Sequence, residues 1–141
     1  MFRARPPRPN VPGPRVRANE VPRVMLLCEK EKSGVGLRSE LMRLLREPWF
    51  SLFQSIDDYR DSYDGNIIHD LIVYCSVTAE PPEAVRQAVN RIMLLCPEAK
   101  IILYSANKTP PVEPRLVAIV NQPNVKGLAE TIDRLLHPQT V

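Results

Sequence analysis

The sequence predicts an α/β domain in which helices cover both faces of a parallel sheet. From residue 23 to residue 136, short apolar runs alternate with segments whose apolar residues recur at helical spacing. Some runs, such as DLIVYC at 70–75, are almost entirely apolar, which is typical of strands covered on both faces. Strands that alternate with helices imply right-handed crossovers, and therefore one parallel sheet.

The first half of this region contains two predicted strands and two predicted helical segments. Residues 24–28 (VMLLC) form the first strand, and residues 50–54 (FSLFQ) alternate as the second. Between them, a helix follows Ser33 and ends before Pro48, because proline cannot continue a helix. The apolar face of this helix consists of Leu37, Leu41, Leu44 and Leu45. The polar segment 57–66 (DDYRDSYDGN) predicts one or two helical turns.

The second half repeats the pattern. Further strands are predicted at 70–75, 100–105 (KIILYS) and 116–120 (LVAIV). Pro81 and Pro82 open a helix, because proline suits the first helical turn. The inward face of that helix consists of Val85, Ala88, Val89, Ile92 and Met93. A last helix spans 124–136, with an inward face of Leu128, Ile132, Leu135 and Leu136.

Five strands connected in this way fit the flavodoxin-like sheet order 2-1-3-4-5. In that order, ligands and chemistry lie at the carboxyl ends of the first and third strands. These ends are Cys28 with Glu29, and Cys75.

Composition restricts the protein class. The chain has 141 residues, of which 44% are hydrophobic and 25% charged, as expected for one domain with its own core. No apolar run approaches membrane-spanning length, and the basic N-terminus is not followed by an apolar segment, so neither a membrane span nor a secretory signal is expected. Three cysteines without CxxC spacing argue against a disulfide framework and structural zinc, and a reducing cytoplasm is expected.

The N-terminal segment has a different composition. Residues 1–22 contain six prolines, which exclude a helix or a central strand and predict a disordered arm. Residues 1–23 hold six arginines and one acid, so their net charge is +5, and the rest of the chain carries about −2. One interpretation of the arm is a flexible terminus without a binding role. The other is a contact for nucleic acid, an acidic lipid surface or an acidic protein patch. The arginines of that contact would be Arg3, Arg5, Arg8, Arg15 and Arg17. The folded domain is expected at 23–137, with a short tail at 138–141.

Three stretches resemble the receiver domain of bacterial two-component response regulators, the CheY-like type. CPEAKIILYSA at 96–106 is similar to the family's fourth strand, and QPNVKGLAETIDRLL at 122–136 to its last helix. DLIVYC at 70–75 is similar to its third strand. The resemblance covers about residues 23–137.

The resemblance implies five site positions. The acid pair that holds Mg²⁺ falls on Cys28 and Glu29, and the phosphorylated aspartate falls on Cys75. The hydroxyl of the fourth strand falls on Ser105, and the lysine of the fifth falls on Gln122. Two thiols and one carboxylate suit Mg²⁺ poorly, because it prefers several oxygen ligands. The implied protein is a degenerate pseudo-receiver with no metal, no cofactor and no enzymatic activity.

The resemblance also fails between the fourth and fifth strands. Pro110, Pro111 and Pro114 exclude a regular helix there, so the family's fourth helix should be shortened or missing. The fifth strand, LVAIV, lacks the aromatic residue through which receivers relay their switch. Partner choice therefore cannot be taken over from the family.

Two alternatives use the cysteines, which otherwise simply fill space. Cys28 and Cys75 end neighbouring strands of the predicted order, at a spacing that a disulfide tolerates, so a redox pair is one alternative. A cysteine-phosphate enzyme is the other, with SGVG at 33–36 as its phosphate loop. Against it, Arg38 lies ten residues after Cys28, farther than in tyrosine phosphatases.

Other polar and aromatic residues are expected to be structural. His69 and His137 are isolated in the sequence and expected to be exposed. Trp49 is expected to pack in the core, with an exposed anchor for a partner as the alternative. The acidic cluster should be a solvated face; its members are Asp57, Asp58, Asp61 and Asp64. We therefore expect a cytoplasmic bacterial signalling module that acts by binding another protein, either a second copy or a different chain.

Overall fold

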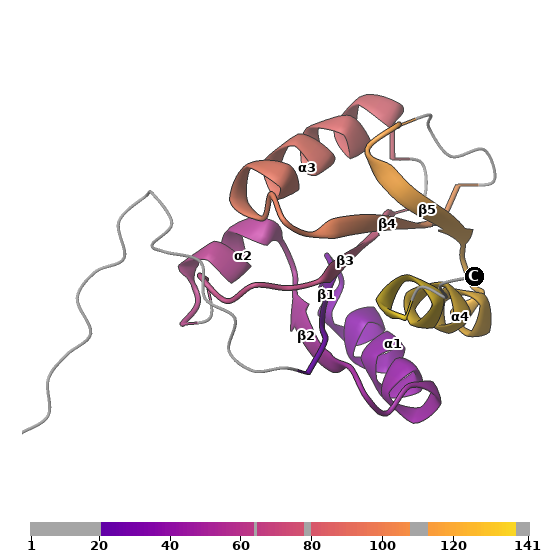
Figure 1. The fold of residues 1–141 in the computed structure, drawn as a ribbon. Helices are drawn as coiled ribbons and strands as arrows, with labels where there is room; N and C mark the ends of the chain where they lie inside the picture. Colours follow the sequence, from indigo (N-terminus) through magenta and orange to yellow (C-terminus); the bar gives the residue numbers. More distant parts are fainter. Residues whose placement is uncertain (1–20, 64, 78–79, 108–112, 138–141) are drawn as a thin grey trace, which may run out of the picture.

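The computed structural model describes residues 21–63, 65–77, 80–107 and 113–137. It contains one parallel sheet whose order is β2-β1-β3-β4-β5, so the predicted flavodoxin-like order is confirmed (Figure 1). The strands are β1 (Arg23–Cys28), β2 (Trp49–Phe53), β3 (Leu71–Cys75), β4 (Lys100–Ser105) and β5 (Leu116–Asn121). Each predicted strand is present, with bounds that differ by one residue at most.

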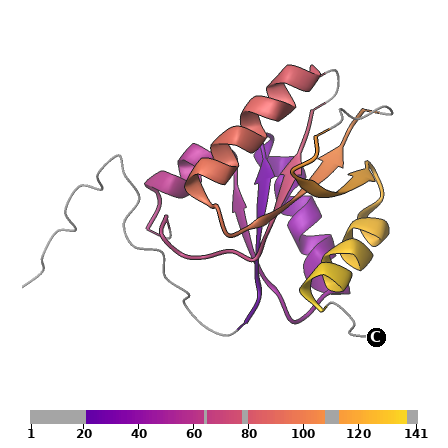
Figure 2. The same cartoon turned by 45° about the horizontal axis from the view of Figure 1, so that its top comes forward.

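In the described residues, four helices cover the sheet in two layers. They are α1 (Glu31–Leu44), α2 (Ile56–Asp61), α3 (Pro82–Leu95) and α4 (Val125–Leu136). Helices α1 and α4 lie on one face, and α2 and α3 lie on the other (Figures 1 and 2). Two helices begin at a side-chain cap, because Ser55 accepts a hydrogen bond from the Asp58 amide and Asn124 from the Gly127 amide. None of the described helices is long and apolar enough to cross a bilayer.

The alternation of side chains along the strands builds two cores. In β1, Val24, Leu26 and Cys28 pack on the α1/α4 face, whereas Met25 and Leu27 pack on the α2/α3 face. The same alternation in β3 directs Cys75 toward the α1/α4 core, where it is partly buried. Cys28 and Cys75 therefore share one face of the sheet.

The connection between β4 and β5 bears out the expected loss of a helix. The described residues of this connection, 106–107 and 113–115, are not helical. Ile119 pairs with Leu103, whose side chain belongs to the α2/α3 core, yet Ile119 is 42% exposed. It stays exposed because the described part of the connection adds no helix to that face.

The ends of α1 and β2 differ from the sequence-based expectation. Helix α1 begins two residues before Ser33 and has no side-chain cap. Leu44 was expected inside but is exposed at the last residue of α1, and Leu45 packs against the core from the following turn. Trp49 was expected in the core, and that expectation is wrong. It is 57% exposed at the first residue of the edge strand, beside the Arg23 guanidinium.

The expected exposure of His69 is also wrong, because its side chain is fully buried. The chain before β3 folds against α2, where the Tyr59 hydroxyl donates to the Ile67 carbonyl at 2.6 Å. His69 Nδ1 lies 3.1 Å from that same carbonyl, and Nε2 lies 3.1 Å from the Ser51 hydroxyl. Since a carbonyl only accepts, Nδ1 carries the proton and Nε2 accepts from Ser51. His137 is exposed, as expected, with Nε2 2.9 Å from a Glu47 carboxylate oxygen.

Candidate functional site at the carboxyl edge of the sheet

The ends of four strands meet at one edge of the sheet. Cys28 is paired with Cys75 in the β1–β3 register, and β4 ends at Ser105. Gln122 directly follows β5, and its backbone N–H donates a hydrogen bond to the Ser105 carbonyl at 2.7 Å. Glu29 follows β1 and is exposed. The structure thus gathers the five residues that the sequence analysis singled out. Their correspondence to a receiver's phosphorylation site stays a prediction.

A cavity of about 420 Å³ opens at this edge, between the strand ends and the start of α1. Cys28, Glu29, Cys75 and Gln122 contribute to its wall. Ser105 is not part of this wall and is almost completely buried. The cavity therefore gives access to both thiols but not to the hydroxyl.

The two thiols contact each other. Cys28 Sγ and Cys75 Sγ lie 3.0 Å apart, within hydrogen-bond distance for sulfur. Cys28 is 5% exposed and Cys75 is half-buried. The hydrogen bond with Cys75 lowers the pKa of Cys28, although burial opposes this. The same hydrogen bond, together with burial, raises the pKa of Cys75. Cys28 is thus the thiol of the pair that ionises first.

Gln122 has a structural role that the sequence did not indicate. Its side-chain amide donates to the Tyr104 carbonyl at 2.7 Å and to the Ser76 carbonyl at 3.1 Å. It therefore joins the ends of β3 and β4. A neutral amide held in this way cannot supply the positive charge that balances a phosphoryl group.

The Ser105 hydroxyl is engaged within its own loop. It donates to the Asn107 carbonyl and accepts from the Asn107 amide, both at 3.1 Å. The neighbouring Ser76 hydroxyl accepts from the Ala106 amide at 3.0 Å. These bonds fix the chain after β4 and turn the Ser105 hydroxyl to the backbone.

The described residues of this edge form no cluster of ligands for a hard cation. Among the described residues, no group of three histidine, cysteine, aspartate or glutamate side chains could hold a metal ion. Glu29 is the carboxylate nearest in sequence to the thiol pair, and it is exposed on the loop after β1. Thiols are poor partners for Mg²⁺, which prefers oxygen.

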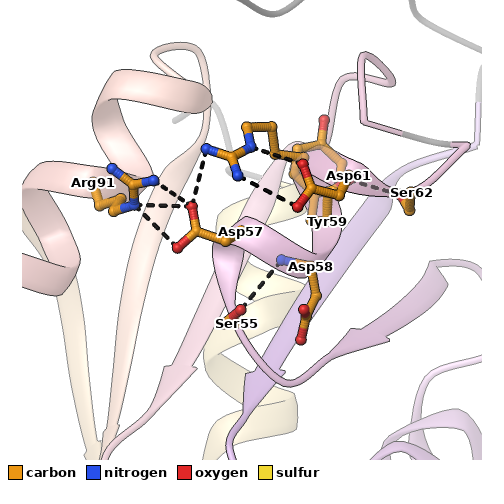
Figure 3. Close-up of polar contacts among 8 residues, drawn as sticks. Ser55, Asp57, Asp58, Tyr59, Asp61, Ser62 and Arg91 are labelled. Atoms are coloured by element: carbon orange, nitrogen blue, oxygen red, sulfur yellow. Dashed lines mark hydrogen bonds and ion pairs between the residues drawn. The ribbon is translucent and has the colours of Figure 1, made fainter. Parts of the chain in front are cut away.

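Two members of the acidic cluster on α2, Asp57 and Asp61, form ion pairs at an exposed surface (Figure 3). The Asp57 carboxylate accepts from Arg91 of α3, with Nε 2.9 Å from Oδ1, and lies 3.3 Å from Arg60. Arg60 also contacts Asp61 at 3.0 Å. The hydrogen bond from Arg91 is the main reason why the pKa of Asp57 is lowered. This network ties α2 to α3, and Asp64 lies outside the described residues.

On the other side of the edge, the structure reveals a tyrosine–carboxylate pair that sequence reasoning missed. The Tyr74 hydroxyl donates to Glu80 at 2.5 Å, and Glu80 also accepts from the Val77 amide at 3.1 Å. Burial and the nearby Glu80 raise the pKa of Tyr74. The pair lines a second cavity of about 540 Å³ between β3 and α3. One sequence feature could have indicated this pair. Tyr74 directly precedes Cys75 in the strand, so its side chain faces the opposite layer of helices.

The strand order and the two helical layers are those of the receiver-domain fold. A response regulator from Thermotoga maritima is similar over 82% of this chain and 98% of its own, with a TM-score of 0.57 and 15% identity. An orphan response regulator of H. pylori covers 82% and 97%, with a TM-score of 0.60 and 19% identity.

A putative pilus assembly protein (CpaE) from Burkholderia thailandensis has the same fold. It covers 82% of this chain and 98% of its own, with a TM-score of 0.64 and 12% identity. No family model and no curated protein sequence matches the chain. At these identities the similarity establishes the receiver fold, and function has to be argued from the site.

Proposed function

We propose that this chain is a pseudo-receiver, a bacterial regulatory module that acts by binding another protein, without phosphorylation and without catalysis. The observation that carries the proposal is Cys75 at the end of β3, in contact with Cys28. In a receiver this position would hold the aspartate whose carboxylate takes the phosphoryl group. A thiol that shares its hydrogen bond with a second thiol offers no such carboxylate.

Two further features support the loss of phosphorylation. Gln122 uses its amide to join β3 and β4, so no cation follows β5 at that position. Ser105 directs its hydroxyl to the backbone of its own loop. Phosphoryl transfer depends on positioned charge, and these residues supply none.

Intact-mass spectrometry after incubation with acetyl phosphate and Mg²⁺ tests this proposal. We expect no gain of a phosphoryl mass, whereas a receiver domain with its acceptor aspartate, treated in parallel, gains one. A phosphoryl gain on this chain would contradict the proposal. The Cys75→Ser and Glu29→Gln variants would then show whether a thiol or a carboxylate accepts the group.

The exposed aliphatic side chains of β5 support a protein partner. Val117 and Ile119 are 45% and 42% exposed on the edge strand of the sheet. Edge strands that expose apolar residues favour pairing with another chain. A second copy is the partner to test first, by sedimentation velocity over a range of concentrations. We expect Ile119→Lys to abolish association, while Val35→Lys on α1, a site of equal 42% exposure, leaves it unchanged. If the wild type stays monomeric at all concentrations, the partner is a different protein.

A second candidate function is contact with a polyanion through the arginine-rich arm. Residues 1–20, which include Arg3 and Arg17, lie outside the described residues, so this proposal rests on the charge of the sequence. Binding to nucleic acid should weaken steeply with salt and disappear when residues 1–22 are deleted. Binding that survives the deletion would exclude the arm.

The cysteine-phosphate enzyme has less support. Arg38, the nearest arginine after Cys28 in the sequence, is not part of the cavity wall, whereas Lys30 and Lys32 are. Cys28 Sγ contacts Cys75, and the side chain is only 5% exposed. A phosphate-cradling loop surrounds its thiolate with backbone amides and not with a second thiol.

A further inference from the structure

We propose that Cys28 and Cys75 form a reversible intramolecular disulfide, which makes the carboxyl edge of the sheet a site of two-electron thiol oxidation. The two sulfur atoms lie 3.0 Å apart, on residues that are directly paired in the β1–β3 register. The oxidation is independent of protein binding, so it goes beyond the proposed function and can be tested without a partner.

The geometry allows the bond without separating the strands. Neighbouring strands lie about 4.8 Å apart, and a disulfide joins residues whose Cα atoms are about 4.4–6.8 Å apart. Both side chains extend from the same face of the sheet toward the α1/α4 core. The sulfur atoms must approach by about 1 Å to reach the S–S bond length of about 2.0 Å. Side-chain rotation can supply a movement of this size.

Access and reactivity also favour this pair. Both thiols line the cavity of about 420 Å³, which a small oxidant can enter. Thiolate is the reactive form of cysteine, and the hydrogen bond between the two sulfur atoms lowers the pKa of Cys28, because Cys75 can donate once Cys28 has ionised. The formal charges of the same cavity wall balance, because Lys30 and Lys32 are matched by Glu29 and Glu40. Cys96 offers a contrast, because it is fully buried in the other core.

The oxidant that we name is a peroxide. The Cys28 thiolate attacks one peroxide oxygen, the O–O bond breaks, and a proton converts the leaving hydroxide to water, which leaves a sulfenic acid. The Cys75 thiol then attacks the sulfenic sulfur, the S–O bond breaks, and a second water leaves. The two cysteines lose two electrons and two protons, and the peroxide is reduced to two waters. A dithiol such as dithiothreitol reverses the step by thiol–disulfide exchange.

The location suggests what oxidation would do. The bond would link β1 to β3 at the mouth of the cavity, where a receiver takes up its phosphoryl group. The same edge of the sheet would therefore exist in two covalent states, the reduced dithiol and the oxidised disulfide. A pseudo-receiver could use these states as its input in place of phosphorylation, a use that does rest on the proposed function.

Peptide mapping tests the bond directly, because trypsin places each cysteine in a separate peptide. Cys28 lies in 24–30 (VMLLCEK), Cys75 in 61–86 and Cys96 in 92–100 (IMLLCPEAK). The folded full-length chain is treated with hydrogen peroxide, blocked with an alkylating reagent, digested and analysed by mass spectrometry. We expect the intact chain to lose two hydrogens and the 24–30 and 61–86 peptides to be linked, with full recovery of both free peptides after dithiothreitol.

Controls make each outcome decisive. Cys96→Ser should oxidise like the wild type, whereas Cys28→Ser and Cys75→Ser should not lose two hydrogens. If either variant fails to fold, the wild type oxidised in urea serves as the control instead. Without the fold to hold Cys28 beside Cys75, that sample should also contain disulfides to Cys96. No loss of two hydrogens in the folded chain would overturn the proposal. Links that involve Cys96 or join two chains, or oxygen added to one cysteine without a link, would overturn it equally.

Discussion

The contact between α1 and the sheet at Gly34 makes a sharp prediction, because a single methyl group there meets the Leu52 side chain and the Cβ of Cys28. Gly34 is buried in α1. A Cβ at this position would lie 2.7 Å from Leu52 Cδ1 and 3.0 Å from Cys28 Cβ. The Leu52 methyl is the end of a flexible side chain and can move away. The Cys28 Cβ is attached to β1 and cannot. Gly34→Ala should therefore overpack this contact.

The expected magnitude follows from two opposing effects. Alanine stabilises a helix interior by about 1 kcal/mol relative to glycine. Overpacking a core contact costs about 1–3 kcal/mol. The net effect of Gly34→Ala is a loss of up to about 2 kcal/mol in the free energy of unfolding. Gly36 is the matched control, because it lies in the same helix, is exposed, and has no atom within 4 Å of an added Cβ. Gly36→Ala should gain about 0.5–1 kcal/mol.

Equilibrium unfolding in urea, followed by circular dichroism, measures both variants under the same conditions. Gly34→Ala should be less stable than Gly36→Ala by about 1–3 kcal/mol, since helix propensity cancels between them and only the contact remains. If Gly34→Ala were as stable as Gly36→Ala, the close approach of α1 to Cys28 would be refuted. A changed slope of free energy against urea would mean that the variant alters compactness as well as stability.

Three further substitutions test other contacts, each by urea unfolding. Asp57→Asn should cost about 0.5 kcal/mol, because its exposed pair with Arg91 is screened by solvent. This loss should shrink as the pH falls through the lowered pKa of Asp57, and a loss that persists in acid would argue against the ion pair. Arg115 holds the pKa of Glu113 at about 2, below its ordinary 4.5. The wild type should therefore exceed Glu113→Gln in stability above about pH 4.5 and lose this advantage toward pH 2; a pH-independent difference would contradict the pairing. His69→Ala should cost about 2–4 kcal/mol through a buried cavity and lost hydrogen bonds, and a near-neutral effect would show that His69 is not packed as described.

The site changes how the two cysteines are interpreted. Each cysteine alone would be explained as a small apolar residue at a strand end. Together they place two sulfur atoms at 3.0 Å beside a cavity, at the edge of the sheet where this fold carries its chemistry. Under the proposed pseudo-receiver function, the two cysteines that replace the phosphoryl acceptor and one of the paired acids also form a dithiol. The proposed loss of phosphorylation and the proposed disulfide are compatible at one site, because both depend on the ends of β1 and β3.

Most of the fold could be predicted from the sequence, because the relevant signals are local. Apolar runs of five or six residues mark β1, β3 and β4, and prolines mark the start of α3 and the disrupted connection before β5. Alternating strands and helices with right-handed crossovers also fit the flavodoxin-like strand order that the structure has. Even the neighbourhood of Cys28 and Cys75 follows, since the order places β1 beside β3.

The surroundings of residues outside regular elements could not be predicted. His69 precedes β3 in a segment without periodicity, and only the packing of that segment under Tyr59 buries it. Trp49 has the composition of a core residue but begins an edge strand, where half of its surroundings is solvent. The periodicity of α1 also fails at its last residue, Leu44, where the helix ends.

The sequence by itself determined the receiver fold, the missing helix and the residue types at the site. Only the tertiary structure decided what those residues do to one another. That Gln122 joins two strand ends, and that two thiols touch instead of pointing apart, depends on side-chain rotamers and on atoms brought together from distant parts of the chain. Local sequence patterns specify which face a strand buries, but contacts between strand ends are fixed only when the whole sheet has packed.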